Sequence, residues 1–500
     1  MLISNLPTRY AVAALGLMGM AVIYGLRVNI SVAIVAMVNH SALEHMKIMK
    51  TVDTVVLTNS TDNACGFQKE SSDLHEEDGP FLFTAQQQGL ILSSYYWGYL
   101  VSMIPGGRIS ELYSAKWVMF FAVVMCMAST LLTPIAAIYG GYAGVIACQF
   151  FKGIGGGVTF PCTHCLLSHW SPKEERSKLS SLTYTGTCLG TVISQYMSGA
   201  LSSHLGWESV FYVSGCLAVP WVISWAFYVT DYPSQHKYIG KAEREMLETK
   251  IQSSATAEKP KLPWRDIVKS KPFWSIVICH TCSNWGYYVL LIELPIYLRT
   301  ILLFGIEENG VITAISFLAM AISTVICGYV VDHYIKKGSI SIGKARKLST
   351  TISSLGPALC MALITFVGCQ RYVGAALLCI AVACHGAMFS GFVINHMDIA
   401  PKFAGTLMAF TNVPGTVSGI IVPVFVGAIT NNNNTVEAWR IIFFVTVGLY
   451  FIEFIAFTVW GSGEEQSWNK GGTSDNLNNV QLDVTDNVKP TPNGNNTMQA

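Results

Sequence analysis

Charged residues are scarce in this chain. Asp, Glu, Lys and Arg make up 12% of the 500 residues, against about 25% in a typical soluble domain, whereas 51% are hydrophobic. This composition excludes an ordinary soluble domain, and the net charge of +1 excludes nucleic-acid binding driven by bulk charge. The first apolar stretch is longer than the roughly 7–15 residues of a signal-peptide core, so we expect it to stay in the membrane.

Chemical motifs are equally scarce. We find no nucleophile paired with a base, no phosphate-binding loop and no strong metal site, so no enzyme, cofactor or metal centre is predicted. Cys162 and Cys165 have a zinc-like spacing, as do Cys279 and Cys282. Cysteine is also a common small apolar helix residue, and that is the preferred interpretation here.

Long apolar runs are abundant. Twelve of them approach the roughly 20 residues that a helix needs to cross a bilayer. In chain order these spans are 10–38, 85–105, 117–137, 141–167, 180–201, 209–229, 273–298, 308–331, 349–368, 372–395, 403–428 and 440–460. The sequence therefore predicts an all-α membrane protein with twelve transmembrane helices.

A long connection after span six divides the spans into six and six, as in transporters built from two related bundles. We predict an N-terminal bundle over 1–230, a cytoplasmic linker over 231–272 and a C-terminal bundle over 273–460. The tail 461–500 is rich in Asn, Thr, Gly and Asp and is predicted to be disordered.

Lysine and arginine set the predicted orientation, with the N-terminus in the cytosol. Of the 31 basic residues, two lie inside spans and most of the others lie in inner loops. The predicted outer loops hold Lys47, Lys50, Lys69, Arg299, Arg371 and Arg440. The glycosylation sequons at Asn59, in the large outer loop 39–84, and at Asn433 agree with this orientation.

Arg27 is the most informative residue. It lies in the middle of the first apolar span, where a charge costs about 2.5 kcal/mol or more, so it is expected to face a cavity and to bind something negative. Its guanidinium offers forked donors to carboxylate or phosphate. Tyr24 and Ser31 are spaced to share its helix face. The alternative is an internal salt bridge that only locks two helices together.

Several segments around these residues carry a family resemblance. They include YGLRVNISVAIVAMVN, GLILSSYYWGYLVSMIPGGRISE, GWESVFYVSG, NHMDIAPKFAGTLMAFTN and GSGEEQSWN. The chain resembles the anion:cation symporter family of the major facilitator superfamily, which groups sodium/phosphate cotransporters, sialin and vesicular glutamate transporters. Within it, the chain looks more like sialin and the insect phosphate-cotransporter-like proteins.

The resemblance implies two six-helix bundles around a cavity lined by spans one, four, seven and ten, with alternating access by rocking. It also implies that Arg27, in an intact motif, binds the substrate anion. Asn284 and Tyr288 in span seven lie in a family-like stretch and are expected to contact the substrate. Ser390, Asn395 and His396 in span ten are weaker candidates.

Span four departs from the family pattern. Gln149 stands where the family has an arginine, and Gly156 stands where it has a glutamate tied to proton coupling. Lys152, about 60° round the helix from Gln149, is predicted to supply a second cation to the anion site; a packing role is the alternative. The run Gly155–Gly157 is also typical of close helix packing.

Other ionisable residues are candidates for coupling or gating. His164, His280 and His385 lie in spans four, seven and ten and could titrate near neutral pH, although a packing role is the commoner one. Glu293 lies near the outer end of span seven. For Glu453, in span twelve, we prefer a structural or snorkelling role. Leu92 and Ser283 replace residues of vesicular glutamate transporters, which argues against glutamate loading of vesicles.

Two acidic residues are predicted to act as gates. Asp332, in the loop signature Gly328–Lys337, is expected to cap a helix across the inner loop and to hold the outward-facing state. Asp398, in the Asn395–Asp398 segment, is expected to pair with a basic group. Neither is expected to bind substrate.

These patterns predict a monomeric secondary transporter of a small anion, coupled to Na⁺ or H⁺. Sodium-dependent transport of phosphate or an organic anion is preferred, because the span-four glutamate is missing. Proton-coupled transport of a carboxylate, as in sialin, is the second hypothesis. A non-transporting sensor or scaffold is the third. The short N-terminus lacks an acidic dileucine signal, which favours the plasma membrane over lysosomal or vesicular membranes.

Overall fold

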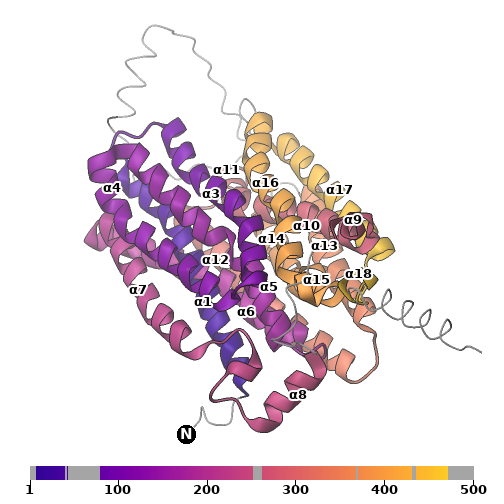
Figure 1. The fold of residues 1–500 in the computed structure, drawn as a ribbon. Helices are drawn as coiled ribbons and strands as arrows, with labels where there is room; N and C mark the ends of the chain where they lie inside the picture. Colours follow the sequence, from indigo (N-terminus) through magenta and orange to yellow (C-terminus); the bar gives the residue numbers. More distant parts are fainter. Residues whose placement is uncertain are drawn as a thin grey trace, which may run out of the picture.

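The computed structural model describes residues 7–39, 42, 79–251, 262–367, 370–430 and 435–470, and these residues are almost entirely helical. Both predicted glycosylation sites, Asn59 and Asn433, lie outside the described residues, as does most of the predicted tail. The helices form two bundles side by side, one from each half of the chain (Figure 1).

The N-terminal half is a bundle of six long and short helices. They are α1 (Thr8–Met37), α3 (Ala85–Leu112), α4 (Ala115–Gly157), α5 (Thr159–Trp170), α6 (Arg176–Leu205) and α7 (Trp207–Tyr228). The linker contributes η1 (Pro233–Gln235), α8 (Lys241–Ile251) and α9 (Trp264–Lys269).

The C-terminal half contains several interrupted helices. Its elements are α10 (Lys271–Tyr288), η2 (Val289–Glu293), α11 (Leu294–Thr300), α12 (Ile306–Lys336), α13 (Ile342–Val367), α14 (Arg371–His385), η3 (Gly386–Ser390), α15 (Phe392–Ile399), η4 (Pro401–Phe403), α16 (Ala404–Thr430), α17 (Val436–Trp460) and α18 (Ser467–Lys470). The π-turn η2 and the 3₁₀-turn η3 interrupt spans seven and ten. Such irregular backbone at membrane depth is tolerated where it lies inside protein or lines a cavity.

Nine helical segments in the described part of the chain are long and apolar enough to cross a membrane. One of them, Ala115–Trp170, has 56 residues and contains a non-helical Gly141 with φ 56°. A Cβ on Gly144 would lie 2.3 Å from the carbonyl oxygen of Ala136, and the thiol of Cys126 donates to the carbonyl of Lys152, so the chain doubles back at Gly141. This stretch is therefore two spans.

Helices α3 and α6 have 28 and 30 residues and supply the remaining two spans. Their many Gln, Ser and Thr side chains make them less apolar than the others. The predicted twelve-helix architecture is confirmed, although the exact domain boundaries stay a prediction.

Glycines allow α3 and α4 to pack in near contact. A Cβ on Gly153 would lie 2.0 Å from the carbonyl oxygen of Tyr95, and one on Gly98 would lie 2.0 Å from that of Phe150. A Cβ on Gly157 would lie 2.3 Å from the carbonyl oxygen of Tyr99. The glycine run of span four thus includes positions where only glycine lets the two backbones approach this closely.

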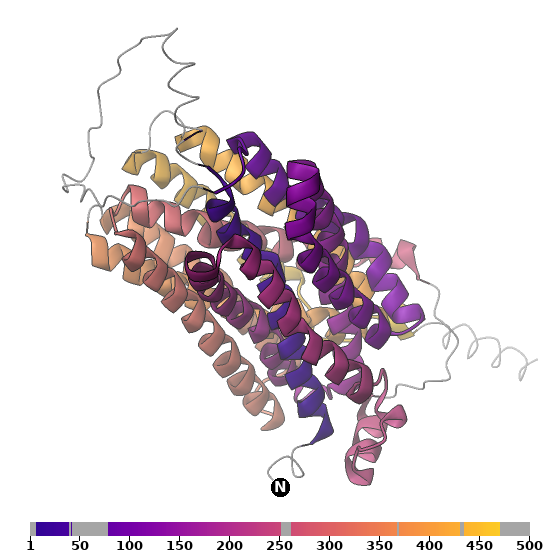
Figure 2. The ribbon, with the colours of Figure 1, turned by 90° about the vertical axis from the view of Figure 1, so that its left-hand side faces the viewer.

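Hydrogen bonds between the halves gather at one end, which we name the inner end and define by Arg176, Arg346 and Asp398. This end also carries the start of α1, and the lysine and arginine pattern predicts that it faces the cytosol. Asp398 accepts from Nη1 of Arg176, in the other half, at 2.8 Å and from Nε of Arg346, in its own half, at 2.7 Å. Arg346 Nη1 donates in turn to the hydroxyl of Ser177 in the other half at 2.6 Å. Figure 2 shows the two halves from the side, with α1 running the length of the bundle. The described structure is closed at the inner end.

Candidate substrate and coupling sites

Arg27 lies among tyrosine rings. Its Cζ atom is 5.2 Å from the ring centres of Tyr24, Tyr95 and Tyr96, and its Nη2 donates to the hydroxyl of Tyr96 at 3.1 Å. Tyr288 of the other half also interacts with the guanidinium, and its ring centre is 6.4 Å from that of Tyr96. Contacts with aromatic faces stabilise the cation without neutralising it.

No acidic side chain is paired with Arg27 among the described residues, whose ion pairs involve other groups. An internal salt bridge, the alternative role for this residue, is therefore not present in the described part of the chain. The guanidinium keeps donors for an external anion, at a place where both halves contribute side chains. Tyr95 and Tyr96 were missed by sequence reasoning, although the aromatic run in span two was a visible signal.

The other residues predicted to bind substrate lie in different settings. Ser31 is exposed one turn beyond Arg27, and its hydroxyl donates to the carbonyl of Val28 at 2.6 Å. Asn284 donates from Nδ2 to Oδ1 of Asn412 at 3.4 Å, and Asn412 Nδ2 donates to the Tyr99 hydroxyl at 3.3 Å. The structure thus joins the predicted Asn284 to span two through Asn412. Binding by these residues stays a prediction.

Gln149 and Lys152 lie inside the N-terminal half. Both are 1% exposed, and neither amide atom of Gln149 nor the Nζ atom of Lys152 has a hydrogen-bond partner. The Nζ atom is 6.0 Å from the ring centre of Phe211 in α7. The Phe211 ring is not among the rings around Arg27 in the described part of the chain. The role of Lys152 as a second cation for the anion stays a prediction.

Tyr95 fills the space next to Gly156. A Cβ on Gly156 would lie 2.0 Å from the Tyr95 hydroxyl oxygen. The glutamate that the family pattern places here would therefore need a different position of Tyr95. Tyr95 can therefore lie against Arg27 in this position because residue 156 is glycine and has no side chain.

Three histidines meet between the halves. The His396 ring centre is 5.5 Å from that of His164 and 6.1 Å from that of His280. Thr411 links two of them, since its hydroxyl is 3.0 Å from His280 Nδ1 and 2.7 Å from His396 Nε2. His164 Nε2 is 2.8 Å from the Val393 carbonyl of the other half, and its Nδ1 bonds the Tyr184 hydroxyl. The predicted His164 therefore connects the two bundles; a coupling role stays a prediction.

The remaining coupling candidates lie in the C-terminal half. Glu293, in η2, is 3% exposed. His385, at the end of α14, is fully buried, and its Nδ1 lies 3.4 Å from the Tyr450 hydroxyl. Glu453 is fully buried, with no hydrogen-bond partner for either carboxyl oxygen. The snorkelling role expected for Glu453 is wrong, because its carboxyl points into the bundle.

The two predicted gating acids, Asp332 and Asp398, make contacts at the inner end, and their gating role stays a prediction. Asp332 accepts from the backbone N–H groups of Ser177 at 3.2 Å and Lys178 at 2.6 Å, and so caps the start of α6 in the other half. Asp398 pairs with two buried arginines, Arg176 and Arg346. Glu111, between spans two and three, accepts from the backbone N–H of Thr406 at 2.6 Å. The partners Arg176, Arg346 and Thr406 were missed, because only folding places them near these acids.

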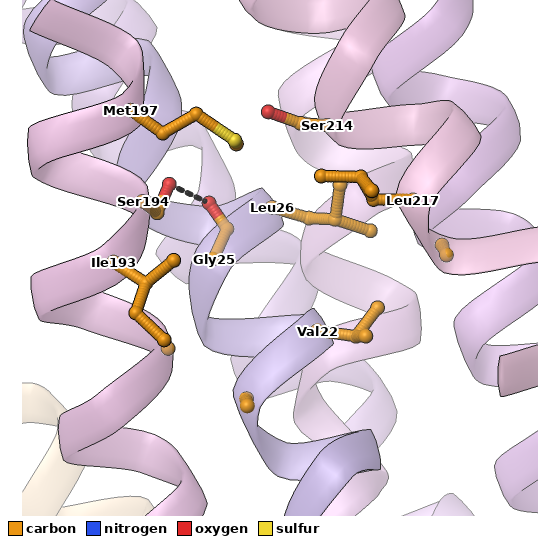
Figure 3. A pocket seen from close by; sticks show the side chains of 11 residues that line it. Val22, Gly25, Leu26, Ile193, Ser194, Met197, Ser214 and Leu217 are labelled. Atoms are coloured by element: carbon orange, nitrogen blue, oxygen red, sulfur yellow. Dashed lines mark hydrogen bonds between the residues drawn. The ribbon is translucent and has the colours of Figure 1, made fainter.

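An apolar pocket of about 160 Å³ lies between α1, α6 and α7 (Figure 3). Val22, Leu26, Ile193 and Leu217 line it, and the Ser194 hydroxyl donates to the Gly25 carbonyl at 2.7 Å at its edge. Its lining includes no charged side chain, so this pocket offers nothing to hold an anion.

Comparisons with known proteins show the family to which the chain belongs. Residues 15–423 match the model of the Major Facilitator Superfamily. The chain is 33% identical over 483 residues to "Putative inorganic phosphate cotransporter" of Drosophila melanogaster, covering 96% of this chain and 89% of that protein. It is 35% identical over 462 residues to human sialin, covering 92% and 90%.

Two further matches extend the comparison. Human vesicular glutamate transporter 2 is 32% identical over 469 residues, covering 93% of this chain and 76% of that protein. The proton:xylose symporter XylE, bound to 6-bromo-6-deoxy-D-glucose, superposes with a TM-score of 0.66 at 15% identity, covering 92% of this chain and 97% of that one; this likeness concerns the fold alone. The chain therefore belongs to the major facilitator superfamily, in the group of phosphate cotransporters, sialin and vesicular glutamate transporters.

Proposed function

We propose that this protein carries a small anion, inorganic phosphate or an organic carboxylate, across a membrane together with a cation. Arg27 binds the anion, and the two bundles expose it alternately to each side. The inner end then opens by separating Asp398 from Arg176 and Asp332 from the start of α6.

One observation carries the proposal. Arg27 is a cation within a membrane span, surrounded by tyrosines of both halves and paired with no acidic side chain among the described residues. An arginine at this depth in a membrane span is costly, and an anionic substrate would balance its charge. Because Tyr96 and Tyr288 come from different halves, an anion at Arg27 would contact both bundles.

The first candidate is sodium-dependent phosphate transport at the plasma membrane. It is supported by the similarity to a protein named as a phosphate cotransporter and by the loss of the span-four glutamate at Gly156. The second candidate is proton-coupled carboxylate transport. The buried, unpaired Glu453 favours this version, because it offers a group that can hold a proton.

Uptake measurements test the proposal. Cells expressing the full chain are given radiolabelled phosphate, and then sialic acid and glutamate, with external Na⁺ present or replaced by choline, at two pH values. We expect saturable uptake of at least one anion. Arg27→Ala should abolish it at unchanged surface level, and Arg27→Lys should lose most of it, because lysine lacks the forked donors.

Two results would contradict the proposal. Normal uptake by Arg27→Ala would remove the anion site from this residue. Absence of saturable uptake for every anion, with the protein present at the cell surface, would favour the sensor or scaffold hypothesis instead. Surface biotinylation provides the required measure of protein level.

A further inference from the structure

Glu453 is an acid in an unusual place. It lies about two turns before the end of α17 and has 0% of its surface exposed. Neither carboxyl oxygen has a hydrogen-bond partner among the described residues. No ion pair of the described residues includes it. An ionised carboxylate buried without a partner is strongly unfavourable, so the group is stable here as the neutral acid. The structure with the closed inner end therefore favours the protonated form of Glu453.

The groups that face Glu453 suit a proton better than a metal cation. On α10, the Cys279 thiol donates to the Glu453 carbonyl at 3.5 Å, and Cys282 interacts with the carboxyl electrostatically. The Ser283 hydroxyl faces the carboxyl outside hydrogen-bonding geometry. Na⁺ and similar hard cations prefer a cage of oxygen ligands, whereas two of these three side chains are thiols.

The other helices packed against α17 bring few charges. The described helix α16 contains no ionisable residue. On α13, the basic residues lie in the first two turns, where Arg346 pairs with Asp398 and Lys347 Nζ donates to the Thr458 carbonyl at 2.8 Å. Cys360 is the remaining ionisable residue of α13. None of these contacts supplies a counter-ion to the Glu453 carboxyl.

A line of side chains connects Glu453 with the anion site. Tyr450, one turn earlier on α17, interacts electrostatically with Glu453, and its hydroxyl is 3.4 Å from Nδ1 of His385. The His385 ring stacks on Tyr287, with centres 5.6 Å apart at 13°, and its Nε2 has no partner. Tyr287 interacts in turn with Arg27. Buried Tyr450 and His385 and half-buried Tyr287 thus link the carboxyl to the arginine.

We propose that Glu453, with Tyr450 and His385, is the proton-binding site that couples anion transport to a proton gradient. The site lies in the C-terminal bundle and takes the role that the family pattern assigns to the glutamate missing at Gly156. Glu453 binds a proton when the outer side is accessible, and the carboxyl releases it after the inner end opens. This inference rests on the proposed function in its second, proton-coupled version.

The test uses the full-length protein in proteoliposomes, with the transported anion found above. Wild-type protein should accumulate the anion when the outside is acidic, with alkalinisation of the outer medium. Glu453→Gln should reduce this proton-driven accumulation at least tenfold. It should keep anion exchange at equal pH on both sides within about twofold of wild type, because exchange needs no net proton movement. Glu437→Gln, an exposed acid on the same helix, is the matched control.

A second variant covers the case in which Glu453→Gln does not fold. Tyr450→Phe removes one hydroxyl and keeps the ring, and should shift the pH of half-maximal uptake. Proton-driven accumulation by a folded Glu453→Gln equal to wild type would overturn the proposal, as would an unshifted pH profile for Tyr450→Phe. Wild-type accumulation that needs Na⁺ at every pH would overturn the assignment to a proton while leaving anion transport intact. If the proposed function itself is wrong, anion exchange at equal pH would also be absent. This result distinguishes failure of the proposed function from failure of the proton assignment alone.

Discussion

Arg27 shows how one residue is prepared for an anion. The rings of Tyr24, Tyr95 and Tyr96 surround the guanidinium, and a single hydrogen bond from Nη2 to the Tyr96 hydroxyl fixes its direction. Aromatic neighbours hold the guanidinium in place and do not neutralise its charge, so a bound anion meets a positive group that is already oriented.

Tyr96→Phe tests this orientation at the residue scale. A hydrogen bond to a charged group contributes about 1.5–3 kcal/mol, so we expect KM for the anion to rise about tenfold or more, with the maximal rate less affected. Initial-rate uptake over a range of anion concentrations measures both. Tyr95→Phe is the control, because Tyr95 contacts Arg27 through its ring. An equal rise in KM for both variants would show that the Tyr96 hydroxyl has no special part.

At the scale of elements, the contact between α3 and α4 depends on glycine. Gly153→Ala would place a Cβ 2.0 Å from the carbonyl oxygen of Tyr95, a backbone atom that cannot move without shifting α3. Overpacking of this kind costs about 1–3 kcal/mol, so the variant should melt at a lower temperature in detergent and lose uptake together with folded protein. Gly140→Ala is the matched control, since no heavy atom of the described residues, apart from its own stretch of helix, lies within 4 Å of its Cβ position. Equal melting temperatures would contradict this account.

The interruptions of spans seven and ten also act at this scale. The π-turn Val289–Glu293 follows Tyr288 directly, and the 3₁₀-turn Gly386–Ser390 follows His385. Both breaks therefore lie next to residues that face the other half or the proposed proton path. A local departure from α-helical geometry releases some backbone groups from their hydrogen bonds. The helix can then bend at that place without unfolding.

At the scale of the whole molecule, the inner end must open for transport. The Oγ atoms of Ser181 in α6 and Ser390 in η3 lie 3.0 Å apart, in opposite halves. A double variant, Ser181→Cys with Ser390→Cys, should form a disulfide under oxidation and lock the inner end. Uptake should then fall to background and return with a reductant, while anion binding from outside persists.

The single variant Ser181→Cys controls for oxidation elsewhere in the chain. Full transport by the cross-linked double variant, with the disulfide verified by mass spectrometry, would show that the inner end stays closed during the cycle. That result would contradict alternating access by separation of the two halves.

The sequence by itself determined the class of the protein. Apolar runs of membrane length, the lysine and arginine pattern and the isolated Arg27 depend only on local composition and the cost of burying charge, so they could be read without a structure. The cap by Asp332 and the pairing of Asp398 were also predicted, although their partners were not.

Only the tertiary structure decided which side chains contact one another, because these contacts depend on which helices pack together. Only the packed bundles show that Tyr95 occupies the space beside Gly156, that Arg346 reaches Asp398, and that the carboxyl of Glu453 points inward instead of toward the lipid. Periodicity gives the face of a helix in a soluble protein, but in a membrane both faces are apolar, so the sequence does not say which face is buried. The placement of a single acid such as Glu453 is therefore fixed by its neighbours on α10 and α13 and not by its own segment.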